Sequence, residues 1–255
     1  GASENTWGSL DEYINFSERK KNTKKIIGGL FKLKQKNHLI FLDIGRPPKK
    51  KFSKCYQSGP LSLEYFLDNI KIISNSGFGC NISNKAVLFS RLTACQSTLT
   101  LNDTSVSKFE RNKLINKVFG NSIKDSFKTY NLNVQNEKSF AACSIEHNGY
   151  EKNFGCTHKR EIFFDKENNY LRGLDHIFKK KDGIPIRYVF RFHINPELTV
   201  VKTMGGNSAL IQLSKNKSLI FTVPGETLEI EKSIFLGGKK ILDNTCITIS
   251  GNLVN

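Results

Sequence analysis

Hydrophobic and polar positions alternate with a period of two through most of the chain. In residues 61–67, leucine or tyrosine occupies every odd position. Such alternation is typical of a strand with one buried face. A tight turn at residues 68–69 leads into a second expected strand at 70–74, and a third is expected at 97–102. These strands lie close together in the sequence.

The same alternation recurs and predicts the fold class. Further strands are expected at 30–33, 39–44, 139–146, 155–164, 170–178, 199–204, 209–213, 219–223, 227–236 and 245–250. Pro47 and Pro48 end the first hairpin, because proline cannot join a central ladder. Residues 105–127 are polar and basic and indicate a long excursion with a short helix at 109–118. We expect an all-β fold, a large antiparallel multi-stranded β-sandwich with about twelve strands or more.

Residues 1–25 differ from the rest. Ser9 can cap a helix and Glu12 completes a capping box, so a short N-terminal helix is expected near residues 9–21. We divide the chain into a helical linker at 1–25 and a β-sandwich domain at 26–255. The first three residues are either a cloning remnant or native.

Composition allows a substantial core and indicates an anionic partner. Hydrophobic residues make up 38% of the chain, and no run of 18 apolar residues predicts a membrane span. No signal peptide is visible, so any export signal would lie upstream. The net charge of +16 is concentrated at 19–25, 46–54 and 179–181. It favours nucleic acid, anionic lipid or acidic polysaccharide, or it reflects a coding bias toward Lys, Asn, Ile and Phe.

The six cysteines form no Cys-x-x-Cys pair, which argues against a zinc ribbon or a thioredoxin-type site. Cys143 and Cys156 flank a turn expected near Asn148-Gly149. They form either a cross-strand disulfide or two free buried thiols.

A series of short motifs, in order along roughly residues 1–250, resembles the β-domain of heparinase II/III-type polysaccharide lyases. No single motif is decisive, but the ordered series is specific. The motifs lie at 43–48 (DIGRPP), 61–64 (LSLE), 147–150 (HNGY), 158–161 (HKRE), 171–175 (LRGLD), 191–196 (RFHINP) and 231–237 (EKSIFLG).

The resemblance implies where the family's chemistry would lie. The catalytic histidine position falls on Cys55, and the three zinc-ligand positions fall on Gln57, Asn75 and Gln96. Zinc favours thiolate, imidazole or carboxylate, so neutral amides are poor substitutes. Either the three amides hydrogen-bond one another without metal, or their oxygens hold a harder cation. We expect no zinc and no other cofactor.

Lyases of this family remove a proton alpha to a uronate carboxylate and expel the glycosidic oxygen, which needs an acid and a base. The resemblance places a Tyr and a His for these tasks in an N-terminal α/α toroid that this chain lacks. It therefore implies that residues 1–25 are a linker from that toroid, and that the full-length protein is a lyase of the periplasm or cell envelope. The chain alone is expected to be inactive.

Four basic side chains are candidates for substrate binding, namely His158, Arg160, Arg191 and His193. Arginine pairs bidentately with carboxylate or sulfate; alternatively these residues hold loops together. We expect a domain that helps bind acidic, uronate-containing polysaccharide. The other interpretation is a basic pseudo-enzyme or interaction domain for another polyanion or a protein. Nucleic acid is disfavoured, because no RNA-recognition or helix-turn-helix pattern is present.

Overall fold

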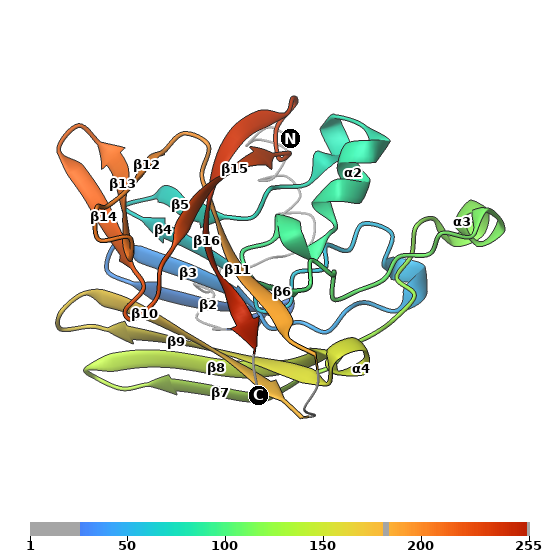
Figure 1. Ribbon diagram of the computed structural model, residues 1–255, viewed down its shortest axis with the longest axis horizontal. Coiled ribbons are helices and arrows are strands. Elements are labelled where there is room, and N and C mark those ends of the chain that lie inside the picture. The colour runs from blue at the N-terminus through green and yellow to red at the C-terminus, as the bar shows by residue number, and fades with distance from the viewer. Residues whose placement is uncertain (1–25, 181–183, 254–255) are drawn as a thin grey trace, which may run out of the picture.

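The computed structural model describes residues 26–180 and 184–253 (Figure 1). This part of the chain contains sixteen strands, three short α-helices and three 3-10 helices. The all-β expectation is therefore confirmed. The helix expected near residues 9–21 lies outside the described residues.

A nine-stranded antiparallel sheet forms one layer of the molecule. Its strand order is β1-β2-β3-β4-β5-β11-β16-β15, and the short strand β6 also pairs with β11. The strands are β1 (Ile26–Ile27), β2 (Leu30–Gln35), β3 (His38–Asp43), β4 (Leu63–Leu67), β5 (Ile70–Ser74), β6 (Leu99–Leu101), β11 (Ile186–Ile194), β15 (Glu229–Phe235) and β16 (Leu242–Leu253).

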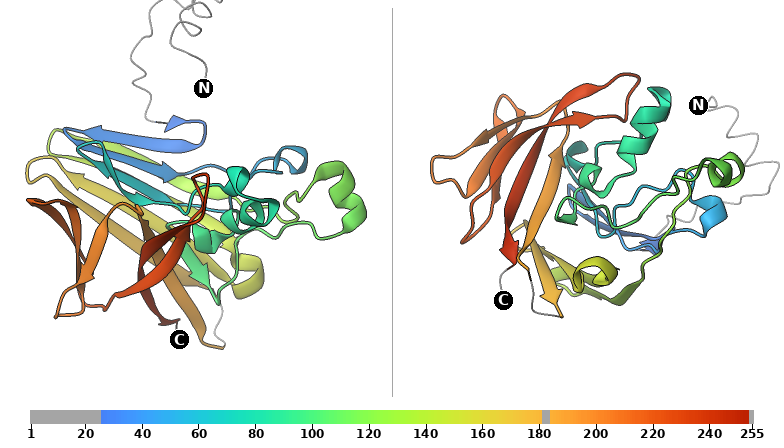
Figure 2. Two further views of the ribbon diagram at one scale, coloured as in Figure 1. Left: turned by 90° about the horizontal axis from the view of Figure 1, so that it is seen from above. Right: turned by 45° about the vertical axis from the view of Figure 1, so that its right-hand side comes forward.

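Two smaller sheets accompany it. A four-stranded sheet in the order β10-β9-β8-β7 lies beneath the large sheet in Figure 1, and a three-stranded sheet in the order β12-β13-β14 lies at its side. Figure 2 shows the same arrangement from two other directions. These strands are β7 (Thr129–Asn136), β8 (Phe140–Tyr150), β9 (Cys156–Asp165), β10 (Tyr170–Lys179), β12 (Thr199–Lys202), β13 (Ser208–Ser214) and β14 (Lys217–Thr222).

The core lies between the sheets because the alternation of each strand places its apolar residues on one face. Strand β3 shows this directly, since His38, Ile40 and Leu42 are buried and the intervening residues are half-buried. The ring of His38 lies 4.9 Å from that of Phe164 on β9, which joins the large and four-stranded sheets. Phe192 on β11 and Phe221 on β14, 5.1 Å apart, join the three-stranded sheet to the large one.

The helices lie in the connections. They are α2 (Asn84–Ser90), α3 (Lys113–Phe119), α4 (Glu151–Phe154), η1 (Lys50–Phe52), η2 (Gly79–Asn81) and η3 (Thr93–Cys95). Helix α3 begins later than the expected range 109–118, because the Asn112 side chain caps it and accepts the Leu114 and Ile115 amides. Helix α2 was not expected; it follows Ser83, whose side chain accepts the Ala86 amide. No helix in the described ranges is long and apolar enough to cross a membrane.

The turn expected at Asn148-Gly149 is wrong. Strand β8 continues through Tyr150, which is buried and donates its hydroxyl to the Leu99 carbonyl at 2.8 Å. The chain reverses instead in α4 and at Gly155, whose φ of +65° is a left-handed conformation that glycine adopts without strain. Cys143 and Cys156 are buried free thiols, opposite Ile162 and Tyr150 respectively.

Candidate functional site

Gln57 and Gln96 meet at the C-terminal end of α2. The Gln57 side-chain amide donates to the Ser90 carbonyl at 3.0 Å and to the Gly77 carbonyl at 3.1 Å. The Gln96 amide donates to the same Ser90 carbonyl at 2.9 Å. The last carbonyls of a helix have no partner within it, so the two amides satisfy one of them. They thereby tie the segment before β4 and the end of η3 to the helix.

Asn75 has different partners, although it follows β5 in the same region. Its side-chain oxygen accepts the backbone N–H of Ser97 at 2.8 Å, and its nitrogen lies 3.4 Å from a Glu64 carboxylate oxygen. The amides of Gln57, Asn75 and Gln96 therefore bond to backbone groups and to Glu64. The alternative in which the three amides bond one another is wrong, because the hydrogen bonds of each amide go to backbone groups or to Glu64.

These residues do not fit a zinc ion. Zinc sites in proteins are built from thiolate, imidazole or carboxylate, and all three positions carry neutral amides. In the described part of the chain, no cluster of three or more His, Cys, Asp or Glu residues has the arrangement of a metal site. The amide nitrogens of Gln57 and Gln96 are occupied as hydrogen-bond donors in helix capping.

Cys55 is an exposed thiol in the segment that leads to Gln57. The buried Arg91 fixes this segment, since its guanidinium donates to the carbonyls of Tyr56 at 2.9 Å and Ser53 at 2.8 Å. The same guanidinium lies 4.1 Å from the Phe109 ring. Among the described histidines, none is hydrogen-bonded to Cys55, so no imidazole is placed to activate the thiol.

His158 and Arg160 lie inside the sandwich and bond to Asp175 of β10. Both are almost fully buried, at 0% and 1% exposure, so a ligand has no access to them in this structure. Arg160 pairs bidentately with the Asp175 carboxylate at 2.7 and 3.1 Å. It also donates to the carbonyls of Leu61 at 2.7 Å and Ser97 at 2.9 Å. Its contacts therefore join the two sheets.

An ordered chain of hydrogen bonds runs through the two neighbouring imidazoles. The Gly149 amide donates to His147 Nδ1 at 3.0 Å, and His147 Nε2 lies 3.2 Å from His158 Nδ1. His158 Nε2 lies 2.7 Å from the Asp175 carboxylate. This direction requires both imidazoles to be neutral with the proton on Nε2. Burial and the nearby positive charges lower the pKa of His147 well below its usual value, and burial lowers that of His158.

His193 and Arg191 also have internal partners. His193 is buried; its Nε2 donates to the Ala94 carbonyl at 2.9 Å, and its Nδ1 lies 3.2 Å from the Ser233 hydroxyl. Burial lowers the pKa of His193 to about 4. Arg191 is bonded to Thr100 and lies 3.4 Å from the Asp103 carboxylate. A role of these four basic residues in ligand binding stays a prediction, and their observed contacts stabilise the fold.

Sequence reasoning missed the partners of these residues. Asp175, His147 and Ser233 lie in motifs that pointed to the family, but nothing in the motifs names their contacts. The available signal was the alternation of side chains along the strand. Asp175 lies an even number of residues from the apolar Leu171 and Ile177 and therefore shares a strand face with them. A carboxylate on a buried face requires a cationic partner.

Two basic loops lie together beside Cys55. Residues 46–54 hold five Lys or Arg and no acid, and residues 108–124 hold five and one Glu, a net of nine positive charges. The Ser53 hydroxyl accepts the Ile123 amide at 2.9 Å, which joins the loops. Figure 1 shows α3 protruding from the body of the protein next to η1. Lys49, Lys51 and Lys54 are exposed.

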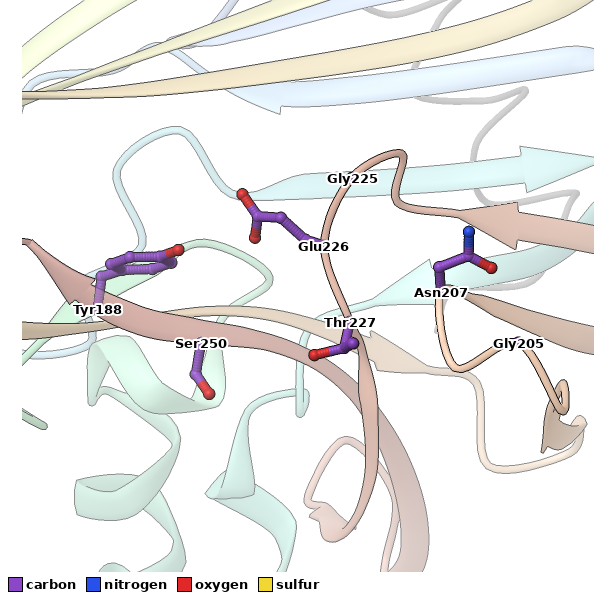
Figure 3. A pocket seen from close by; sticks show the side chains of 7 residues that line it. All are labelled: Tyr188, Gly205, Asn207, Gly225, Glu226, Thr227 and Ser250. Atoms are coloured by element: carbon purple, nitrogen blue, oxygen red, sulfur yellow. The ribbon is translucent and has the colours of Figure 1, made fainter.

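A separate hollow of about 580 Å³ lies between turns near the ends of β11 and β16. Figure 3 shows the Glu226 carboxylate directed toward the ring of Tyr188, with Asn207 on the other side. The hollow contains none of the residues predicted from the sequence as site residues. Its lining is Tyr188, Gly205, Asn207, Gly225, Glu226, Thr227 and Ser250.

Comparison with solved structures shows the same fold in much longer proteins. The heparan sulfate lyase HepC from Pedobacter heparinus matches 98% of this chain with a TM-score of 0.73 and 14% identity. A structure of heparinase III matches 88% of it with a TM-score of 0.62, also at 14% identity. The chain spans 39% of the HepC chain and 33% of the heparinase III chain. A search of curated proteins found no match.

The family model for the heparinase II/III-like C-terminal domain covers nearly all the described residues, from 27 to 253. The chain therefore belongs to the heparinase II/III-like C-terminal domain family.

Proposed function

We propose that this chain is the β-sandwich domain of a heparinase II/III-like protein and forms one wall of a cleft for acidic, uronate-containing polysaccharide. The observation that carries the proposal is the pairing of loops 46–54 and 108–124 beside Cys55. A concentrated positive field attracts polyanions and raises their association rate. The structural neighbours named as heparan sulfate lyases support this class of ligand.

In this proposal the family's site positions have a structural role. Gln57 and Gln96 cap α2 and so hold the segment that carries Cys55 and the basic loop. Residues 1–25 are a linker from an N-terminal toroid domain, and residues 26–255 are the binding domain. Any elimination chemistry would then depend on acid and base groups of that toroid, because Cys55 has no bonded imidazole.

Docking of a protein, or of another domain of the same protein, is a second candidate. The basic loops also expose apolar side chains at Phe52 (68%), Leu114 (77%) and Val118 (75%). Exposed apolar groups next to one another often mark a protein interface. Polysaccharide binding is favoured because the lysines outnumber these groups and no acidic residue occurs in 46–54.

The test measures the affinity of the 255-residue chain for heparan sulfate as the salt concentration is raised. Binding is expected to weaken steeply with salt, since exposed charges are screened within about 10 Å at 0.1 M. The triple variant Lys49→Ala, Lys51→Ala, Lys54→Ala should bind at least about tenfold more weakly, as each tenfold corresponds to about 1.4 kcal/mol.

A matched control removes the same charge elsewhere. Lys232→Ala, Lys239→Ala and Lys240→Ala together take three exposed lysines from the β15–β16 hairpin. The heparan sulfate affinity of this variant should stay within about threefold of that of the natural chain. The small loss is expected because a lower net charge weakens electrostatic steering. Equal loss in both triple variants, salt-independent binding, or equal binding of dextran would contradict the proposal.

A further inference from the structure

The outer face of β10 departs from the pattern expected of a solvated sheet. An antiparallel sheet with one face on the core normally alternates apolar residues inward with polar residues outward. In β10, Leu171 and Ile177 pack against the core and Asp175 bonds to the buried Arg160. The alternate positions on the outer face are nevertheless mostly aromatic or apolar: Tyr170, Arg172, Leu174, His176 and Phe178.

These outer side chains are open to solvent. Tyr170 is 52% exposed, Leu174 50%, Phe178 47%, and Phe163 on the neighbouring strand β9 37%. The Phe163 ring stacks on Phe140 of β8 with centroids 5.2 Å apart, which extends the aromatic surface across the sheet. A contiguous apolar surface of this kind on a protein exterior commonly marks a binding face.

A shallow hollow on this face gives it a specific shape. It encloses about 210 Å³ and is lined by Glu161, Phe163, Arg172 and Leu174. The Arg172 guanidinium lies 5.8 Å from the Tyr170 ring. Within the described ranges, it has no carboxylate partner. An exposed guanidinium beside an aromatic ring and without a carboxylate partner can receive a carboxylate or sulfate group.

The neighbouring acid is already neutralised. Glu161 lies 2.9 Å from the Lys159 ammonium and 3.3 Å from the His176 imidazole. The face thus combines an aromatic strip with the guanidinium of Arg172, and Asp165 opposite Tyr170 accepts the backbone amides of Glu167 and Asn168 and the Asn168 side-chain amide. A sugar ring offers an apolar face for stacking and a carboxylate or sulfate for the arginine, so both features of the strip are matched by one ligand.

We infer that the outer face of β9 and β10 is a second contact surface for the same polysaccharide, with Tyr170 and Phe163 stacking on sugar rings and Arg172 pairing with a carboxylate or sulfate. This inference rests on the proposed function. The surface is formed by different residues from loops 46–54 and 108–124. A long chain bound at both places gains from a high effective concentration at the second.

The experiment compares heparan sulfate affinities of the 255-residue chain and of single variants at low salt. Tyr170→Ala and Arg172→Ala should each raise the Kd about tenfold, the range of a contact residue that carries binding energy. Tyr170→Phe keeps the aromatic ring, so its Kd should stay within about twofold of that of the natural chain. Because these side chains are exposed, the urea midpoint of each variant should equal that of the natural chain.

Two controls match the changes. Ile220→Ala removes an exposed apolar side chain, 67% accessible, from β14, and Lys232→Ala removes one positive charge from β15. Neither should change the Kd more than about twofold. If Tyr170→Ala and Arg172→Ala behave like these controls while the loop-lysine variant loses affinity, the second surface is refuted and the proposed function stands. If the natural chain does not bind heparan sulfate, both fail.

Two further outcomes would overturn the inference in favour of another occupant. β10 is an edge strand, and such strands also pair with second copies of a chain. If the inference is right, sedimentation velocity should give the same mass for the natural chain and for Tyr170→Ala. A dimer of the natural chain that is lost in Tyr170→Ala would assign the face to self-association. Binding of polyuridylate that competes with heparan sulfate and is lost in the same variants would assign it to single-stranded nucleic acid.

Discussion

Replacing Asp175 by asparagine should be among the most destabilising polar substitutions in the described part of the chain. The change keeps the shape of the side chain and removes its charge. Arg160 would remain buried, at 1% exposure, without a counter-ion. Burial alone raises the pKa of Asp175, but the Arg160 charge and the bonds from His158 and Arg160 outweigh it, so the net pKa is lowered.

The magnitude follows from the burial of the pair. Removing one partner of a buried ion pair costs about 3 to 5 kcal/mol, because the remaining charge is left uncompensated. With an m-value of about 3 kcal/mol/M, the urea midpoint should fall by about 1 to 1.7 M. Chemical denaturation of the 255-residue chain, followed by circular dichroism, measures this shift.

Asp103 provides the matched control. Its side chain is 60% exposed and bridges Arg187 at 3.1 Å and Arg191 at 3.4 Å. Exposed ion pairs are worth about 0 to 1 kcal/mol, so Asp103→Asn should barely move the midpoint. If Asp175→Asn and Asp103→Asn shift the midpoint equally, the reasoning from burial is refuted.

A double variant separates charge from hydrogen bonding. Arg160→Met with Asp175→Leu removes the pair and fills most of its volume, which can be neutral where no other group is left unpaired. Here the Leu61 carbonyl loses the Arg160 donor, the Ser97 carbonyl keeps the Leu63 amide at 3.2 Å, and the buried His158 Nε2 loses its Asp175 acceptor. A residual cost of about 1 to 3 kcal/mol is expected from the groups left unpaired. Full recovery of stability would contradict a structural role for those bonds.

Two other predictions concern protonation and metal. Burial lowers the pKa of His147 and His158 in the folded state, so the unfolded chain binds more protons below the usual histidine pKa of about 6.5. Stability should be constant above that pH and fall as the pH drops below it. Urea midpoints across pH 5 to 8 should fall less steeply in His147→Gln than in the natural chain, because His158 and His193 still contribute, and an unchanged slope would contradict a contribution from His147. The combined change Gln57→His, Asn75→Asp, Gln96→His should create stoichiometric zinc binding if the three positions keep a ligand geometry. Zinc titration of the variant and metal analysis of the natural chain test this. Zinc in the natural chain, or none bound by the variant, would contradict the prediction.

The strands were predictable from the sequence because their alternation is a direct consequence of one buried face. The hairpin of β2 and β3, the strands β4 and β5, and the tail after β11 lie near their expected positions. Helix α2 was less apparent, since its seven residues are too few to show a helical period and only the Ser83 cap marks its start.

The candidate site was less predictable than the fold. Gln57, Asn75 and Gln96 could be identified from their positions relative to the family motifs. Their hydrogen-bond partners could not, because these depend on which backbone groups the tertiary structure leaves unpaired, such as the Ser90 carbonyl. The basic runs were visible in the sequence. Their contact through Ser53 and Ile123, 70 residues apart, was not, because it depends on the course of a long irregular excursion.

The capping of Ser90 by two side-chain amides affects how the domain is made in a cell. Where a metal joins a loop to a helix, the folded state depends on metal supply and a chelator can dissolve the link. Here the link consists of groups that are synthesised with the chain, at Gln57 and Gln96. The segment that presents Cys55 and the basic loop can therefore reach its folded position at this junction without a metal-loading step.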